Sequence, residues 1–150
     1  MPDNVPTRAW KGSKDCMKFS KPKKVEKAKY KKLAWTVFSR YIRMKAREYG
    51  EYTKCYTCGT LKPWKQMQAG HGIGGRSNAV LFDERLVKPQ CAGCNLFGGG
   101  QYRIFTRKLI DELGLIEYDK MVHESTTLIS LKEYQFQEIY EKYKKKLEEL

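Results

Sequence analysis

The chain has 150 residues, of which 41% are hydrophobic, a length and composition that suit one ordinary globular domain with additional segments. No apolar run reaches 18 residues and the first residues, MPDNVPTRAWKGSKDC, contain no apolar stretch, so the sequence argues against a membrane-spanning helix and a secretory signal and predicts a soluble cytoplasmic protein. Its 30 lysines and arginines outnumber its 17 acidic residues, and the net charge of +13 favours a polyanionic partner such as nucleic acid.

Residues 1–24 are polar, basic and interrupted by proline, and we expect them to form a flexible arm. A helix is predicted over residues 25–48, because apolar side chains recur there at three- and four-residue steps, namely Tyr30, Leu33, Ala34, Val37, Phe38, Tyr41 and Ile42. Most basic side chains of this segment fall off the apolar stripe. The helix is therefore expected to pack on a core through one face and to expose a basic surface.

The positive charge is distributed unevenly along the chain. Residues 1–54 carry 16 basic and 5 acidic side chains, whereas the remaining residues carry 14 basic and 12 acidic ones. A basic arm and helix attached to a nearly neutral body favour binding to nucleic-acid phosphates, with Arg40, Arg43 and Arg47 as candidate contacts. The alternative is a lysine-rich helix face that is only solvated.

Four of the five cysteines form two C-x-x-C pairs, CYTC and CAGC, and in a cytosolic chain this pattern predicts a zinc site rather than two disulfides. Both sulfurs of each pair can reach one tetrahedral ion, so the predicted zinc ligands are Cys55, Cys58, Cys91 and Cys94. A redox pair and buried free thiols are the alternatives, but redox motifs are seldom doubled outside a βαβ context. The fifth cysteine, Cys16, lies alone in the arm and is not expected to bind the metal.

The two cysteine pairs are separated by 32 residues, more than the roughly 15–20 that connect the pairs of a plain zinc ribbon. The extra length contains two expected strands, over residues 64–69 and 79–82, and between them the glycine-rich stretch GHGIGG. This stretch matches the dinucleotide-binding pattern G-x-G-x-x-G, but no buried apolar strand precedes it and no amphipathic helix follows it. We therefore expect a hairpin whose ends are held by zinc and whose glycine loop presents His71.

Asn95 follows the last cysteine directly and precedes a helix predicted over residues 101–113, which Gly114 would terminate. A hairpin that carries a histidine, followed by a helix start that carries an asparagine, is the outline of a ββα-metal (His-Me finger) nuclease site. The alternative role of Asn95 is to cap the following helix through a hydrogen bond.

The residue types suit phosphodiester hydrolysis. The neutral imidazole of His71 can accept a proton from water near pH 7, which is the task of a general base. The side-chain oxygen of Asn95 would hold Mg²⁺ or Mn²⁺, which neutralises charge on the phosphate, while zinc remains structural. Arg76 and Lys88 are candidate contacts to the flanking phosphates.

The C-terminal part is predicted to be helical. The letters SLKE have the form of a capping box and predict a helix over residues 130–150, and His123 before it is expected to be an ordinary loop residue. The sequence thus predicts an α+β fold over residues 25–150, with a zinc-bound ββα-metal core at 55–114 between an N-terminal basic helix and C-terminal helices.

Five stretches of the sequence resemble the NinG/Rap family of lambdoid phage recombination proteins, which are endonucleases of Holliday junctions and other branched DNA. These stretches are KLAWTVFSRYIRMKAREYG, CYTCGT, QAGHGIGGRSNAVLFDE, PQCAGCN and YRIFTRKLIDELG, and they cover roughly residues 30–114 in order. The sequence is also similar, more broadly, to phage recombination endonuclease VII, in which two C-x-x-C pairs hold zinc and an asparagine follows the last cysteine.

The resemblance implies an HNH-like, metal-dependent endonuclease that cuts branched DNA in the cytoplasm of a bacterial host, with structural zinc and catalytic Mg²⁺ or Mn²⁺. His71 matches the general base and Asn95 a ligand of the catalytic metal, and the zinc ligands match Cys55, Cys58, Cys91 and Cys94. Symmetric cleavage of a four-way junction is most simply done by a two-fold homodimer. The alternative from another class is a non-catalytic zinc-ribbon module that binds DNA or RNA.

The sequence departs from the ββα-metal pattern at three positions. Gly70 stands directly before the base, where many such sites place an acidic or histidine metal ligand. Leu86 stands where the usual HNH asparagine orients the base, and Asn95 takes the place of the C-terminal HNH histidine. The second protein ligand of the catalytic metal therefore stays open, and the candidates are Asp83, Gln68 and a backbone carbonyl.

Overall fold

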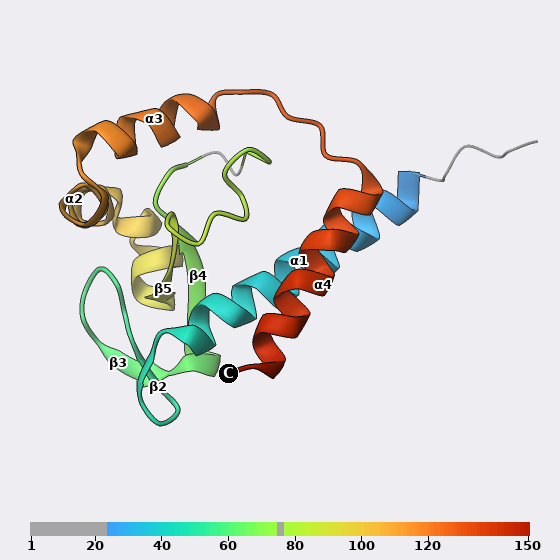
Figure 1. Ribbon diagram of the computed structural model, residues 1–150. Coiled ribbons are helices and arrows are strands. Elements are labelled where there is room, and N and C mark those ends of the chain that lie inside the picture. The colour runs from blue at the N-terminus through green and yellow to red at the C-terminus, as the bar shows by residue number, and fades with distance from the viewer. Residues whose placement is uncertain (1–23, 75–76) are drawn as a thin grey trace, which may run out of the picture.

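The computed structural model describes residues 24–74 and 77–150 (Figure 1). Residues 1–23 of the expected arm, which include Cys16, and the candidate DNA contact Arg76 lie outside the described residues. The elements follow in the order α1 (Lys24–Lys45), β1 (Arg47–Tyr49), β2 (Tyr52–Lys54), β3 (Leu61–Pro63), η1 (Trp64–Gln66), β4 (Met67–His71), β5 (Val87–Cys91), η2 (Gly93–Phe97), η3 (Gly99–Gln101), α2 (Tyr102–Leu113), α3 (Leu115–Ser125) and α4 (Glu133–Glu148).

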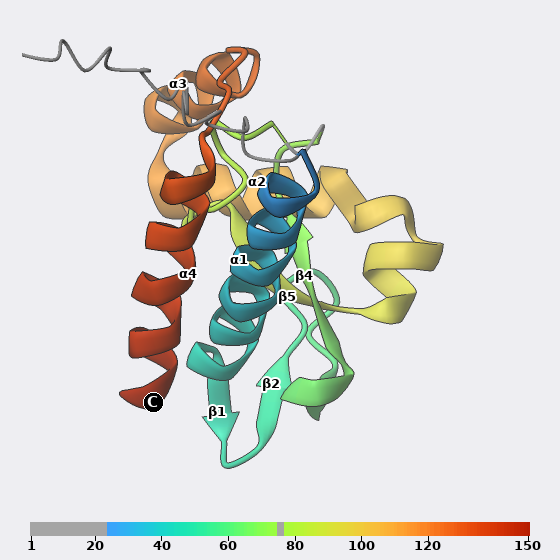
Figure 2. The ribbon, with the colours of Figure 1, turned by 90° about the vertical axis from the view of Figure 1, so that its right-hand side faces the viewer.

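The β4–β5 hairpin lies between two pairs of helices (Figures 1 and 2). Its strands are antiparallel, with Met67 opposite Cys91 and His71 opposite Val87. One buried cluster joins the hairpin to α1 and α4 and contains Phe38, Tyr41, Ile42, Val87 and Tyr143. A second joins the 72–86 loop to α2 and α3 and contains Ile73, Val80, Leu86, Phe105, Leu109 and Met121. The architecture is α+β, as predicted.

Helix α1 buries the apolar stripe that the sequence predicts, and Ala34 and Phe38 on this stripe are fully buried. The helix ends at Lys45, before the expected end at residue 48. The chain then turns through Gly50, whose φ of 59° lies in the left-handed region that favours glycine. Gly50 therefore makes the turn between β1 and β2.

A three-stranded antiparallel sheet, in the order β1–β2–β3, follows α1. The buried Thr53 hydroxyl donates to the Arg43 carbonyl at 3.1 Å and ties this sheet to the end of α1. Cys55 follows β2 directly, so the sheet shapes the loop that carries the first cysteine pair. The sequence does not predict this sheet, because strands of three residues are too short to show an alternating pattern.

The hairpin strands differ from those expected. Residues Trp64–Gln66 form a 3-10 turn, so the first strand begins only at Met67. The prediction of a strand over 79–82 is wrong, because these residues form turns of the long loop, where Val80 is buried in the core without strand pairing. The second strand is β5, whose apolar pattern is interrupted by Pro89 and a buried glutamine.

Helices α2 and α3 pack on the far side of the hairpin. Gly114 ends α2 with a left-handed φ of 83°, as predicted, and its N–H donates to the Ile110 carbonyl at 2.8 Å. The sequence does not predict α3, and this helix corrects the placement of His123, which is helical and not in a loop. Among the described residues, no helix combines the length and apolar character needed to cross a membrane.

Helix α4 packs beside α1 through the buried side chains of Phe136 and Tyr143 (Figure 2). The prediction of a capping box at Ser130 is wrong, because Lys132 is the N-cap residue of α4 and its side chain cannot accept a hydrogen bond. Instead, the Lys132 N–H donates to Gln135 Oε1 at 2.8 Å, and the helix begins at Glu133.

Glu84, in the loop before β5, connects α1 to α4. Its carboxylate accepts hydrogen bonds from Lys45 at 2.9 Å, from the Tyr143 hydroxyl at 3.1 Å and from Lys146. Burial raises the pKa of Glu84, but the two lysines outweigh this effect and lower the pKa from 4.5 to about 2. Because the folded pKa lies below the unfolded value, this contribution to stability is present above pH 4.5 and is lost as the pH falls toward 2.

The Glu84→Gln variant should lower the free energy of unfolding at pH 7 by about 1–2 kcal/mol, since ion pairs open to solvent contribute less than the full pKa shift indicates. The difference from the wild type should shrink between pH 4.5 and pH 3, as urea unfolding at several pH values would show. Glu141→Gln, at an exposed position of α4, should have little effect. A Glu84→Gln difference that stays constant down to pH 3 would contradict this account.

Candidate functional site

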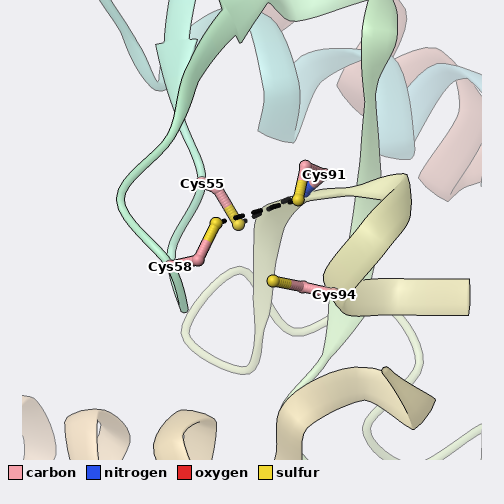
Figure 3. A group of neighbouring side chains, drawn as sticks. All are labelled: Cys55, Cys58, Cys91 and Cys94. Atoms are coloured by element: carbon pink, nitrogen blue, oxygen red, sulfur yellow. Dashed lines mark hydrogen bonds between the residues drawn. The ribbon is translucent and has the colours of Figure 1, made fainter. Parts of the chain in front are cut away.

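The four cysteines of the two C-x-x-C pairs lie together as free thiols, and their sulfurs point toward one another (Figure 3). Cys55 and Cys58 come from the loop between β2 and β3, Cys91 ends β5 and Cys94 lies in η2. All four Sγ atoms lie within 4.8 Å of one another, and those of Cys58 and Cys91 are 3.8 Å apart. Tetrahedral zinc with bonds of about 2.3 Å separates its sulfurs by about 3.8 Å. The cluster therefore fits one zinc ion.

Hydrogen bonds prepare Cys55 to bind a metal as a thiolate. The Cys91 N–H donates to Cys55 Sγ at 3.3 Å, and the Thr57 hydroxyl lies 3.5 Å from the same sulfur. Gln90 Nε2 donates to Thr57 Oγ1 at 3.1 Å, so the Thr57 hydrogen can point at the sulfur. Burial raises the pKa of Cys55, but hydrogen bonds from the Cys58 N–H, the Thr57 hydroxyl and the Cys91 N–H lower it to about 6. These hydrogen bonds therefore favour the thiolate form of Cys55, which is the form that binds zinc.

His71 ends β4 on the face of the hairpin that packs against α1. Its imidazole stacks on the Trp35 indole, with ring centroids 4.9 Å apart and an angle of 18° between the planes. Trp35 is itself held by Phe38 and Phe82, with centroids 5.7 Å and 6.4 Å away. This aromatic group fixes the plane of the imidazole. The sequence gives no sign that Trp35 belongs to this site, because no local pattern links it to a residue so far along the chain.

Asn95 lies on the opposite face of the hairpin, in the π-helical turn η2, and its Nδ2 donates to Gln68 Oε1 at 2.7 Å. Gln68 and Gly72 alternate with His71 along the chain and therefore face α2, where a Cβ at Gly72 would lie 2.2 Å from Leu109. The structure thus brings Asn95 to Gln68, while the imidazole of His71 projects from the other face of the hairpin. The alternative role of Asn95 as a cap is wrong, because α2 begins only at residue 102.

Gly70 leaves room for the fully buried side chain of Gln90. A Cβ at Gly70 would lie 2.0 Å from Gln90 Oε1 and 2.7 Å from its Cδ. Gln90 Nε2 donates to Thr57 Oγ1 and, at 2.9 Å, to the Gly100 carbonyl. Gln90 therefore connects the hairpin, the cysteine cluster and the turn before α2. It occupies the space that a side chain directly before His71 would need.

The Gly70→Ala variant should lower the free energy of unfolding by about 2 kcal/mol, because the added methyl group must displace Gln90 and break its buried hydrogen bonds. Urea unfolding measures this change. The control is Gly74→Ala, since a Cβ at Gly74 would have its nearest neighbour at 3.8 Å and should change stability by less than about 0.5 kcal/mol. Equal effects at both positions would show that Gln90 does not restrict Gly70.

Asp83, a candidate second metal ligand, and Leu86, one of the departures from the nuclease pattern, have roles in the fold. The Asp83 carboxylate accepts hydrogen bonds from the Arg85 N–H at 2.9 Å and from its guanidinium at 3.0 Å and 2.7 Å. Leu86 is buried against α2, and its carbonyl accepts a bond from the Gly72 N–H at 2.8 Å. Of the two side chains considered as a second metal ligand, Gln68 is the one in contact with Asn95.

A group of cations surrounds the buried Trp64 indole. The guanidinium carbons of Arg40 and Arg43 both lie 5.6 Å from a ring centroid of Trp64, and Lys65 Nζ lies 5.7 Å from it. Arg43 also donates to the Ser39 and Met67 carbonyls at 3.0 Å and 3.1 Å. Arg40 and Lys65 are exposed, so this group presents positive charge beside the start of β4.

The other candidate phosphate contacts are engaged within the fold. Arg47 forms an ion pair with Glu51 at 3.3 Å and donates to the Met44 carbonyl at 3.0 Å. Lys88 forms an ion pair with Glu112 at 2.9 Å. The sequence does not show that Arg47 and Lys88 are engaged in ion pairs while Arg40 is exposed, because the folded structure decides which acidic side chains lie beside them.

A four-cysteine cluster at the end of a β-hairpin, with helices on both faces, defines an α+β protein with a candidate zinc centre. Comparison with protein-family models then identifies the family. The model described as Bacteriophage Lambda NinG protein matches residues 6–150, and the chain belongs to this NinG family. This match confirms the NinG resemblance of the sequence. No curated protein and no solved structure matches the chain.

Proposed function

We propose that this NinG-family protein is a metal-dependent endonuclease that cuts branched DNA such as Holliday junctions. The observation that carries the proposal is that two side chains are attached to one strand: His71 ends β4, and Asn95 bonds to Gln68 within it. The open end of this hairpin packs in one cluster with Cys55, Cys91 and Cys94. In this proposal β4, β5 and α2 form a ββα-metal core, and zinc is its structural ion.

His71 acts as the general base in the proposed reaction and accepts a proton from the water that attacks the phosphodiester. Imidazole suits this role because it exchanges a proton close to neutral pH. The stack on Trp35 limits the orientations of the ring, so a proton acceptor is held ready at the strand end. The His71 side chain is half-buried, which limits its contact with bulk solvent.

The donor atoms around Asn95 fit a small divalent cation that prefers oxygen ligands. Because Asn95 Nδ2 donates to Gln68, the amide is oriented, and its Oδ1 accepts no hydrogen bond from the described residues. Asn95 Oδ1 would hold Mg²⁺ or Mn²⁺ together with water and phosphate oxygens, and Gln68 Oε1 is the second candidate ligand. The bound ion would neutralise the charge that develops on the scissile phosphate.

The DNA in this proposal is held mainly through its phosphates. Arg40 and Lys65, the exposed cations beside Trp64, would contact the DNA backbone without reading the base sequence. Such binding weakens steeply as salt rises, because counterions released from DNA must be restored. We also propose that the active form is a two-fold homodimer acting in the bacterial cytoplasm, since two related sites can cut opposite strands of a four-way junction.

A cleavage assay on a four-way junction, with a linear duplex of the same sequence as control, tests this function. The proposal predicts cuts in the junction with Mg²⁺ or Mn²⁺ and little cleavage of the duplex. The alternative is a zinc module that binds DNA or RNA without cutting it. The observation that favours it is the space beside Gly70, which Gln90 fills and where no metal-binding side chain stands. Junction binding without cleavage in either metal ion would support that alternative.

A further inference from the structure

The segment between the last cysteine and α2 exposes an unusual amount of apolar surface. The Phe97 side chain is 87% exposed and that of Leu96 is 61% exposed, at the end of η2. Tyr102 and Ile104, in the first turn of α2, are also exposed. In Figure 2 this segment (yellow) stands out from the body of the molecule on the side away from α4. Exposed aromatic surface of this kind commonly marks a binding site.

The backbone holds this protruding turn in a defined shape. The Gly98 N–H donates to the Gly93 carbonyl at 2.8 Å, which closes the π-helical turn. A Cβ at Gly98 would lie 2.4 Å from Gln101 Nε2 and 3.0 Å from the Gly93 carbonyl oxygen. Gln101 has a left-handed φ of 50° and is the one described residue other than glycine with a positive φ. Cys94 anchors the same turn to the cysteine cluster, so Phe97 is presented on a rigid support.

The charges around this turn suit nucleic acid better than a protein surface. Residues 92–110 contain three basic side chains and no acidic one. Two of them, Arg103 and Arg107, lie one turn apart on α2, are exposed and form no ion pair with another described residue. A partner for this region should therefore combine an apolar flat surface with negative charge. An unpaired nucleobase flanked by phosphates has both properties.

We infer that Phe97, supported by Leu96, is a wedge that stacks on an unpaired or unstacked base at the branch point of DNA, with Arg103 and Arg107 on the adjacent phosphates. This inference rests on the proposed function. The turn that exposes Phe97 also bonds to the hairpin through Asn95, so the wedge would fix the distance between the branch point and the cut. Apolar wedges at base steps work in this way in proteins that kink DNA.

The test uses the full chain and a four-way junction that carries 2-aminopurine either at the branch point or within an arm, without added divalent ions. Wild type should change the fluorescence of the branch-point base and leave the arm base unchanged. Phe97→Ala should abolish this change and weaken junction binding by about tenfold, without changing duplex binding. Phe97→Trp should restore both effects. Tyr49→Ala, which removes another exposed aromatic side chain, should behave as wild type.

The outcomes separate this inference from the proposed function. A wild-type protein that does not bind the junction at all would overturn both. A wild-type protein that binds and cuts the junction, but leaves the branch-point base unchanged, would overturn the wedge alone. If Phe97→Ala instead converts a dimer into monomers in sedimentation, the exposed surface belongs to a contact between two copies, and the wedge is overturned as well.

Discussion

Removing the metal from the four-cysteine site is expected to unfold the hairpin region of this protein. Structural zinc contributes about 10–16 kcal/mol in small zinc domains, as much as the whole stability of an ordinary domain. Cys55, Cys91 and Cys94 share one buried cluster with Met67 at the open end of the hairpin. A chelator, or Cys91→Ser, should therefore lower the free energy of unfolding by about 5 kcal/mol or more.

Elemental analysis of the purified protein and thermal melting followed by circular dichroism measure this effect. One zinc ion per chain is expected for wild type and none for Cys91→Ser. Cys16→Ser is the matched control, because Cys16 is the cysteine that belongs to neither C-x-x-C pair, and it should keep the metal. A metal-free wild type that melts at the same temperature with and without chelator would rule out a structural zinc site.

Replacing His71 by alanine should lower the rate of junction cleavage by about 10²–10⁴-fold, the range typical of a lost general base. Junction affinity and zinc content should not change, since neither the cysteines nor the exposed cations contact this side chain in the proposal. His71→Gln fills most of the space beside Trp35 that alanine leaves empty. A similar loss of cleavage in this variant shows that the missing proton acceptor, and not the cavity, is the cause. His123→Ala is the control, because the only other histidine of the chain is exposed on α3. Cleavage that survives in both His71 variants would exclude this base.

The features that the sequence predicts correctly depend on local patterns. The apolar repeat of α1 is visible because its residues recur with the helical period, and Gly114 marks the end of α2 because a left-handed φ favours glycine. The cysteine cluster could be predicted because two C-x-x-C pairs suit one tetrahedral ion wherever the intervening chain runs. These inferences need no knowledge of tertiary contacts.

The features that the sequence does not reveal depend on contacts between distant segments. The apolar run at 79–82 predicts a strand, whereas in the fold it forms part of a loop and the strand that pairs is Val87–Cys91. The buried Gln90 gives no local signal, because glutamine usually lies on the surface. Gly70 looked like a missing metal ligand, and only the packing of Gln90 above it gives a physical reason for glycine.

The sequence proposes His71 and Asn95 as candidate residues but does not predict how they are arranged. His71 lies at the end of a hairpin strand, as expected, yet it faces α1 and stacks on Trp35. Asn95 contacts Gln68 on the face toward α2. The alternation of side chains along a strand therefore places the proposed base and the proposed metal ligand on two sides of β4.

The measurement that tests the central proposal most directly is cleavage of a four-way junction by wild type, His71→Ala and Asn95→Ala, mapped at nucleotide resolution in Mg²⁺ and in Mn²⁺. We expect wild type to make paired cuts near the branch point that depend on the metal ion. Both variants should lose these cuts although each still folds and binds zinc. A wild-type protein that carries zinc and binds the junction tightly, but leaves every strand intact in both metal ions, would contradict the proposal.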